Sequence, residues 1–299
     1  ENSSEIDVAV EMAFVDWVLW EELVLRGGVI LVPLGRINVN HDGPVRELTE
    51  RPLVSTYVIP TTLSEAGVGG HGAFRIGGEL DLAWEAYAVN GFNILSADGE
   101  LSAPITRREL ILREGRTSLG GDVNDGVAST GRIGLEWSEH LAAGGSWHVG
   151  TYDERGDNLL SIFAGDFAAA WGPFALEGEI AVADFQRDLF ARAMGVPDVF
   201  WGYYIQGSVS GMPEVLRRAV PYLFDRDGRS FTIALRFDWV DLDGDRGEVI
   251  EPGINFRPTP DTVFKFSWRF TPNSFGLRGV PGTEHFDDEG FVFSLSTYF

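Results

Sequence analysis

The segment 291–299 reads Phe-Val-Phe-Ser-Leu-Ser-Thr-Tyr-Phe, and it decides the expected fold. Successive side chains of an extended strand point to opposite faces, so Phe291 and Phe293 share one face while Ser294 and Ser296 share the other. The first face suits lipid and the second suits a wet interior. An apolar outside, a polar inside and an aromatic end are typical of the last strand of a bacterial outer-membrane β-barrel.

The same alternation recurs along nearly the whole chain. In 261–273, for example, Phe264 and Phe266 lie on one face, and Lys265 and Arg269 on the other. A soluble sandwich would bury such aromatic faces against a second sheet. No helical segment is available to cover them, so we predict an all-β fold that closes into a transmembrane antiparallel barrel in lipid. The predicted strands are 6–19, 22–37, 66–77, 79–91, 128–139, 144–155, 159–172, 174–186, 199–211, 229–242, 247–258, 261–273 and 287–299.

The connections between these strands alternate between short and long, a second property of outer-membrane barrels. Short turns would face the periplasm and long loops the outside. The connection 210–228 departs from this rhythm, and its Pro-Glu-Val-Leu-Arg-Arg sequence favours a short helical turn. The short turns fall at 20–22, 77–79, 139–144, 171–174 and 258–261, and the long loops at 38–65, 93–127, 186–198 and 272–286.

The strand number raises a problem of parity. The first and last predicted strands run in the same direction, and two such neighbours cannot close an antiparallel barrel. We therefore expect one more strand before Glu1, and about fourteen strands in total, with twelve and sixteen as alternatives. The chain 1–299 would be a single barrel domain, with a signal peptide removed upstream.

Composition agrees with a membrane barrel. The 299 residues are 44% hydrophobic, with 9 Trp and 21 Phe, and yet carry a net charge of -22. No apolar run is long enough for a transmembrane helix. In a barrel the aromatic residues face lipid while charges occupy the lumen and loops. The acidic balance argues against nucleic acid as a partner and against direct attraction to anionic lipopolysaccharide. The expected partners of a membrane barrel are the surrounding outer-membrane lipids and lipopolysaccharide.

The segments 29–44 and 47–62 also resemble a known family. The first begins Val-Ile-Leu-Val-Pro-Leu-Gly-Arg, and the second contains Glu-Leu-Thr-Glu-Arg-Pro-Leu-Val. Together with 85–91, 212–214, 240–243 and 296–299, they are similar to the phosphate-selective porin superfamily of Gram-negative outer membranes, in its wider branch. The resemblance implies passive diffusion of small solutes, no cofactor and often a trimer. Named members use clustered lysines and arginines in the lumen, whereas this chain has a single lysine, Lys265, so phosphate selectivity is not carried over.

The alternation also predicts which charged side chains line the pore. Acidic residues outnumber basic ones on the predicted inner faces, and low-dielectric walls focus that excess, so we expect a mild preference for cations. The alternative is that these charges pair across strands and leave little net field. The predicted pore-lining residues are Asp81, Glu85, Arg132, Glu136, Asp166, Glu177, Glu179, Arg236, Asp238, Glu251, Arg257, Lys265 and Arg269.

Two long loops are candidates for narrowing the pore. Loop 93–127 contains Arg107, Arg108, Arg113 and Arg116, and it either folds into the lumen to set the constriction or caps the outer surface. Loop 38–65 is the other candidate. Its prolines and glycines suggest a fixed path.

Metal binding and catalysis have little support. Asp241, Asp243, Asp245 and Glu248 are weak candidates for a hard cation that bridges to lipopolysaccharide phosphates, and a solvated hairpin tip is the favoured interpretation. No Ser, His and Asp set can be placed together, so we predict no enzyme.

The sequence therefore predicts a porin that conducts small hydrophilic solutes or ions. The alternative is a plugged barrel that serves as a scaffold or anchor for a partner. Small outward residues in two strands, Gly70, Gly72, Gly165 and Ala169, predict a homotrimer with its interface there, unless the glycines only relieve crowding where the wall bends.

Overall fold

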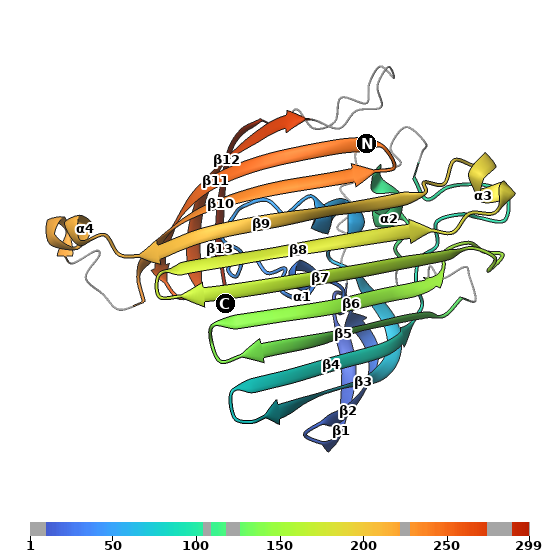
Figure 1. The fold of residues 1–299 in the computed structure, drawn as a ribbon, viewed down its shortest axis with the longest axis horizontal. Coiled ribbons are helices and arrows are strands. Elements are labelled where there is room, and N and C mark those ends of the chain that lie inside the picture. The colour runs from blue at the N-terminus through green and yellow to red at the C-terminus, as the bar shows by residue number, and fades with distance from the viewer. Residues whose placement is uncertain (1–9, 104–108, 118–125, 222–227, 274–288, 299) are drawn as a thin grey trace, which may run out of the picture.

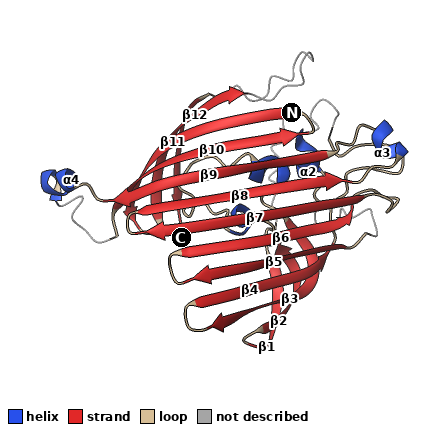
Figure 2. Ribbon diagram, viewed as in Figure 1, coloured by secondary structure: helices blue, strands red, loops and turns tan. Residues whose placement is uncertain are grey.

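The computed structural model describes residues 10–103, 109–117, 126–221, 228–273 and 289–298. Thirteen strands form one antiparallel sheet in chain order, which confirms the predicted all-β architecture. The sheet curls around an interior, and connecting segments of the polypeptide occupy that interior (Figures 1 and 2). The strands are β1 (Ala13–Trp20), β2 (Leu23–Leu31), β3 (Ser64–Ile76), β4 (Leu80–Val89), β5 (Ala128–Trp137), β6 (Leu141–Thr151), β7 (Leu159–Trp171), β8 (Phe174–Phe185), β9 (Val199–Gly211), β10 (Ser230–Leu242), β11 (Asp245–Thr259), β12 (Thr262–Asn273) and β13 (Gly290–Thr297).

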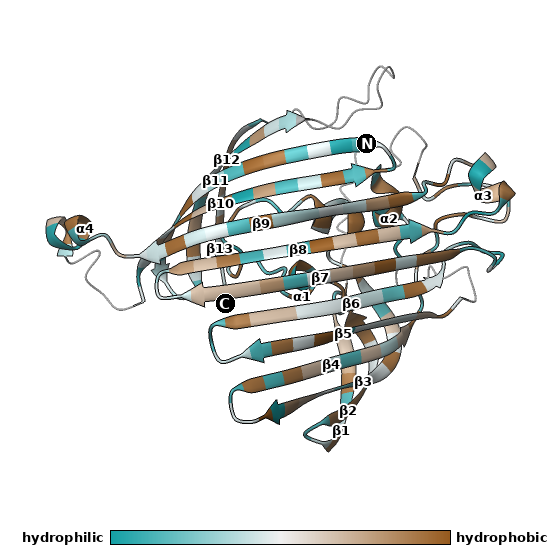
Figure 3. Ribbon diagram, viewed as in Figure 1, coloured by the Kyte–Doolittle hydropathy of each residue, from teal (hydrophilic) through white to brown (hydrophobic). Residues whose placement is uncertain are grey.

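Each described strand pairs with its neighbours in sequence, and the register fixes which side chains share a face. Arg236 of β10 lies opposite Gln206 of β9 and Glu251 of β11, so polar side chains form inner rows across strands. The outer face carries exposed apolar side chains such as Trp268 and Phe293. Figure 3 shows the resulting alternation of hydrophobic and hydrophilic positions along the strands.

The two edge strands of the sheet are β1 and β13. Among the described residues, β1 pairs with β2 and β13 with β12, and no pairing between β1 and β13 is present. The further strand expected before Glu1 lies outside this chain and stays a prediction. No helix in the described ranges is long and apolar enough to cross a membrane.

The predicted strand 22–37 is too long, because β2 ends at Leu31. Pro33 has no backbone N–H to donate to a ladder, and the chain turns away from the sheet there. It then forms α1 (Arg36–Val39) and the single π-helical turn η1 (Val54–Val58) before it rejoins the sheet at Ser64. We call residues 32–63 the insert, since they lie inside the curved sheet (Figure 1).

Asn38 joins the two ends of the insert. Its buried amide donates to the carbonyl oxygens of Val32 (2.7 Å) and Leu63 (3.2 Å) and accepts from the backbone N–H of Leu63 (2.8 Å). The backbone N–H of Val32 also donates to the Leu63 carbonyl at 3.0 Å. The insert is thus closed at its base into a compact loop.

The long-loop end of the interior is apolar, which differs from the expected polar inner faces. Side chains of the insert such as Val54 and Ile59 pack against inward residues of the wall such as Ile162 and Phe200 in one buried cluster. Apolar residues occupy inward positions at this end because the insert covers them in place of water. Polar inward residues such as Glu177 and Arg257 lie nearer the short-turn end.

Short helices in the connections complete the fold. The described part of loop 93–127 contains α2 (Ile111–Glu114), whose Ile111 and Leu112 join the same apolar cluster. Asp188 caps α3 (Leu189–Ala193) by accepting from the Ala191 N–H at 2.7 Å. The helical turn expected in 210–228 is present as α4 (Glu214–Ala219), which projects from the short-turn end (Figure 1).

Candidate functional site: the interior and its insert

Glu179 of β8 holds the insert from one wall of the sheet. Its carboxylate accepts the backbone N–H groups of Arg36 and, at 3.2 Å, Ile37, and the hydroxyl of Ser55 donates to it at 3.3 Å. The side chain is almost fully buried, and a buried carboxylate needs such donors to offset its lost hydration. One wall residue therefore fixes both α1 and η1.

Gly35 allows this close approach. Its φ of 71° lies in the left-handed region, which favours glycine. A Cβ at this position would lie 2.6 Å from Cδ1 of Ile59 and 2.9 Å from a carboxylate oxygen of Glu179. Its backbone N–H donates to Oγ of Ser146 at 2.9 Å, so the turn into α1 is itself attached to β6.

A buried ion network holds the insert from the opposite wall. Arg236 of β10 donates to Asp238 and Glu251, both at 2.7 Å, and to the backbone carbonyl of Glu50 at 2.9 Å. Asp238 in turn accepts the backbone N–H of Leu53 at 3.2 Å. Arg236, Asp238 and Glu251 are all buried, so this network combines mutual charge compensation with attachment of the insert.

One amide and two basic side chains of β11 and β12 bind the insert closer to the short-turn end. Asn255 donates to the Glu47 carboxylate at 2.7 Å, and Arg257 lies 3.4 Å from the same carboxylate. The ammonium group of Lys265 donates to the carbonyl of Gly43. These contacts engage the charged groups of Arg257 and Lys265.

Arg46 of the insert is an exception among these basic groups. Its Nε and Nη1 are buried without a hydrogen-bond partner among the described residues. Burial, together with the nearby positive charges of Arg51 and Arg236, lowers the pKa of its guanidinium to about 10. The pattern of strand alternation gave no signal for this residue, because it lies in the insert.

The wall formed by β4 to β9 carries most of the inner acidic side chains. Arg132 and Asp166 form a two-point ion pair with contacts of 2.6 and 2.8 Å. Glu177 accepts from Gln206 at 3.0 Å and lies 3.3 Å from Nε of Arg36. The insert therefore brings one guanidinium to the acidic wall.

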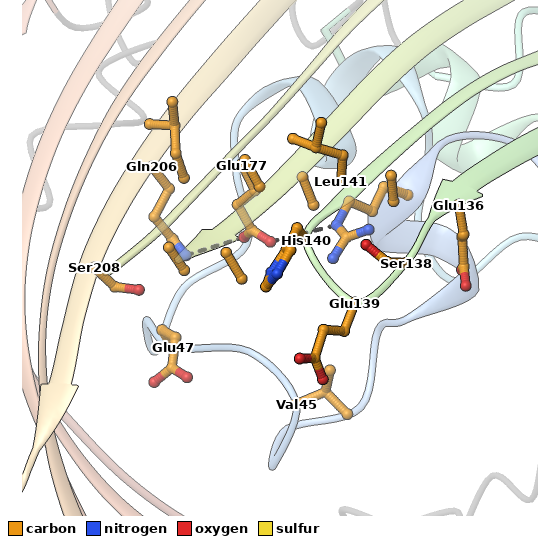
Figure 4. Close-up of a pocket in the computed structure, with 17 residues that line it drawn as sticks. Val45, Glu47, Glu136, Ser138, Glu139, His140, Leu141, Glu177, Gln206 and Ser208 are labelled. Atoms are coloured by element: carbon orange, nitrogen blue, oxygen red, sulfur yellow. Dashed lines mark hydrogen bonds and ion pairs between the residues drawn. The ribbon is translucent and has the colours of Figure 1, made fainter. Parts of the chain in front are cut away.

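Two cavities open at the short-turn end of the interior. The first has a volume of ≈ 390 Å³, and its lining includes Glu47, Glu139 and Glu177 (Figure 4). The second has a volume of ≈ 600 Å³, and its lining includes Asp81, Glu85 and Arg132. Arg36 and Glu136 line both cavities. The arrangement can receive small polar or charged molecules from the short-turn side.

The remaining predicted residues are placed as follows. Glu85 accepts from the Tyr87 hydroxyl at 2.9 Å, and Asp81 pairs with Arg75 at 2.7 Å. Arg269 has its Nε buried without a partner in the described chain, and Ser267 donates to Glu251 at 2.7 Å. All these side chains belong to inward-facing rows of the sheet.

The two loop candidates have different positions. The insert, which covers most of loop 38–65, is inside the sheet. In loop 93–127, Arg116 donates to the backbone carbonyl of Thr62 at 2.9 Å, so this loop packs on the long-loop end of the insert, while the Arg113 side chain is exposed. Arg107 and Arg108 lie outside the described residues.

The hairpin expected as a weak metal candidate is held by an ion pair instead. Asp241 accepts the Gly244 N–H at 2.7 Å and pairs with Arg246 at 2.9 Å. Among the described residues no group of three or more His, Cys, Asp or Glu side chains is arranged to hold a metal, and this includes Asp243, Asp245 and Glu248.

Comparison with known proteins gives little further information. No family model matches the chain. A protein of Aquifex aeolicus (strain VF5), described as uncharacterized, is 36% identical over 165 residues, which is 54% of this chain and 34% of that protein. The match thus spans about a third of the relative's length. Among solved structures, an anion-selective porin from Comamonas acidovorans aligns with a TM-score of 0.36 and 12% identity over 78% of this chain and 85% of the porin.

Proposed function

We propose that this chain forms a porin-like channel of a Gram-negative outer membrane, in which small hydrophilic solutes or ions diffuse passively without a cofactor or a catalytic step. One observation carries the proposal: the exposed outer face of the sheet is apolar and aromatic, while charged side chains lie on its inner face, beside the apolar cluster of the long-loop end. This is the reverse of a soluble protein, and it is the arrangement that a lipid-embedded barrel requires. Trp268 and Phe293 outside and Arg236 and Asp238 inside are examples.

A mild cation preference is supported by the distribution of partners. The basic groups of β10 to β12 are largely engaged by the insert and by buried carboxylates. Glu136 and Glu139 line the short-turn cavity, and the structure describes no hydrogen bond or ion pair for either carboxylate. Their uncompensated charge would attract cations to that mouth.

The plugged scaffold is the second candidate, and one observation favours it. The apolar cluster formed by the insert, the described part of loop 93–127 and the wall leaves little polar surface at the long-loop end. In that case the barrel would anchor an extracellular or periplasmic partner.

Single-channel recording in planar lipid bilayers tests the proposed function. A channel gives steady, reproducible conductance steps whose size scales with salt concentration. A purified, folded protein that inserts and gives no steps would refute diffusion and favour the scaffold.

Assembly is part of the same proposal. Gly70, Gly72 and Gly165 lie on outward positions, and an apolar groove of ≈ 330 Å³ lies at Gly165 between Phe163 and Trp201. Small residues allow two walls to approach closely in lipid, which supports a homotrimer surrounded by lipid and lipopolysaccharide. Native mass measurement in mild detergents tests this, and a persistent monomer would contradict it.

A further inference from the structure

The ≈ 390 Å³ cavity at the short-turn end combines groups from four parts of the chain. The insert contributes Arg36 and Glu47, and the turn between β5 and β6 contributes Glu139. Glu177 extends from β8 and Gln206 from β9, and Figure 4 shows their side chains around one hollow. No single sequence segment encodes this set of groups.

The cavity has a positive group on one side and negative groups on the others. Arg36 touches Glu177 only through Nε, at 3.3 Å, and its side chain is about a quarter exposed, at 28%. No contact described in the structure uses its two terminal nitrogens. A guanidinium edge with free N–H groups is suited to binding a carboxylate at two points.

Glu136 and Glu139 are exposed to the cavity, and neither has a described partner. Glu47 adds a third carboxylate, held by Asn255 and Arg257. Carboxylates at separate points of the rim suit ammonium groups of a ligand better than a compact metal ion, since no three of them converge in the described chain.

Between the charged groups the lining is apolar and small. Ala142, Ala168, Ala170 and Ala175 line the cavity, so an aliphatic chain fits against them. Tyr204 is the inward-facing residue of β9 two positions before Gln206. Its hydroxyl is buried without a described hydrogen-bond partner, and its charged neighbours are Glu177, Glu179, Arg36 and Arg236. A cavity of this volume lies at the lower end of small-molecule sites, of roughly 300–1,000 Å³.

We propose that this cavity is a binding site for a basic α-amino acid, with Arg36 bound to the ligand carboxylate and Glu136 and Glu139 bound to its ammonium groups. The inference deepens the proposed channel function by naming a solute class, and in that respect it rests on it. The site itself requires only the folded interior, so its occupancy can be measured without any conductance.

Isothermal titration calorimetry on the purified, detergent-solubilised protein tests the site with four probes. Lysine has the carboxylate and both ammonium groups. Cadaverine lacks the carboxylate, norleucine lacks the side-chain ammonium, and glutamate has the opposite side-chain charge. We expect saturable binding of lysine, with cadaverine and norleucine weaker by about tenfold each, because each lacks one charge-assisted contact. Glutamate is expected to show no saturation.

Variants assign the contacts. Arg36→Gln should make lysine and cadaverine bind equally, and Glu139→Gln should weaken lysine by about tenfold. Glu22→Gln is the matched control, because Glu22 is an exposed acidic residue of the short-turn end that lines neither cavity. If Arg36→Gln does not fold, the ligand series and Glu139→Gln still decide whether the cavity binds lysine as proposed.

The outcomes separate the two proposals. Absence of saturable lysine binding, or equal affinity of the unmodified protein for lysine and cadaverine, would overturn the site even if bilayers show conductance. Lysine binding without conductance steps would refute diffusion and leave the site standing.

Discussion

The buried network around Arg236 gives the sharpest test of how the insert is held. Replacing Arg236 by Met keeps most of the side-chain volume but leaves the carboxylates of Asp238 and Glu251 without their cation. Both carboxylates are fully buried. Removing one partner of a buried ion pair costs about 3–5 kcal/mol, because the remaining charge is uncompensated. The same change removes the 2.9 Å hydrogen bond to the Glu50 carbonyl, so the insert loses an attachment as well.

We expect two measurable effects of Arg236→Met. The thermal unfolding midpoint in detergent should fall, as followed by circular dichroism or by heat-modified migration on gels. Limited trypsin digestion at room temperature should cut the insert after Arg46, which is half-buried in the intact protein, whereas the bond after Arg51 resists trypsin because Pro52 follows it. Mass spectrometry identifies the cut.

Two control variants accompany this test. Arg75→Met breaks an exposed ion pair with Asp81, and we expect no measurable change, because solvent screens such pairs. Adding Asp238→Asn and Glu251→Gln to Arg236→Met should restore part of the lost stability, since neutral amides tolerate burial without a cation. Two results would show that the network does not hold the insert as argued. One is an Arg236→Met variant as stable as the unmodified protein, and the other is a triple variant no more stable than Arg236→Met.

Three further tests address the turn into α1, the base of the insert and the mouth of the interior. Gly35→Ala should lower the unfolding midpoint, because the added Cβ would lie 2.6 Å from Cδ1 of Ile59 and the backbone φ is positive. The control Gly134→Ala should leave the midpoint unchanged, since no atom lies within 4 Å of its added Cβ. Equal effects of the two substitutions would contradict the packing argument. Asn38→Ala removes the acceptor of the buried Leu63 N–H and should cost about 1–3 kcal/mol by chemical unfolding, while the same change at exposed Asn40 should cost little. Glu136→Gln should reduce any cation preference in reversal potentials under a salt gradient, and an anion-preferring unmodified protein would refute the acidic-mouth argument.

The strands and their inward and outward faces were predictable because the signal is local. A period of two in side-chain direction follows from the extended backbone alone, so all thirteen strands were located, with errors mainly at their ends. The error at β2 has a local cause too, since Pro33 and Gly35 are where the chain leaves the sheet. Sequence also restricted the candidates for the interior segment to two loops.

What the sequence determined by itself is therefore the sheet, its rhythm of connections and the alternation that sets which side chains of a strand share a face. Only the tertiary structure decided that residues 32–63 occupy the interior, which charges they bind, and that Arg36 lies against the acidic wall. These contacts join residues far apart in the chain: 143 positions separate Arg36 from Glu179, and 208 separate Glu47 from Asn255. Such pairs depend on the curvature and register of the whole sheet, and no local period in the sequence encodes either.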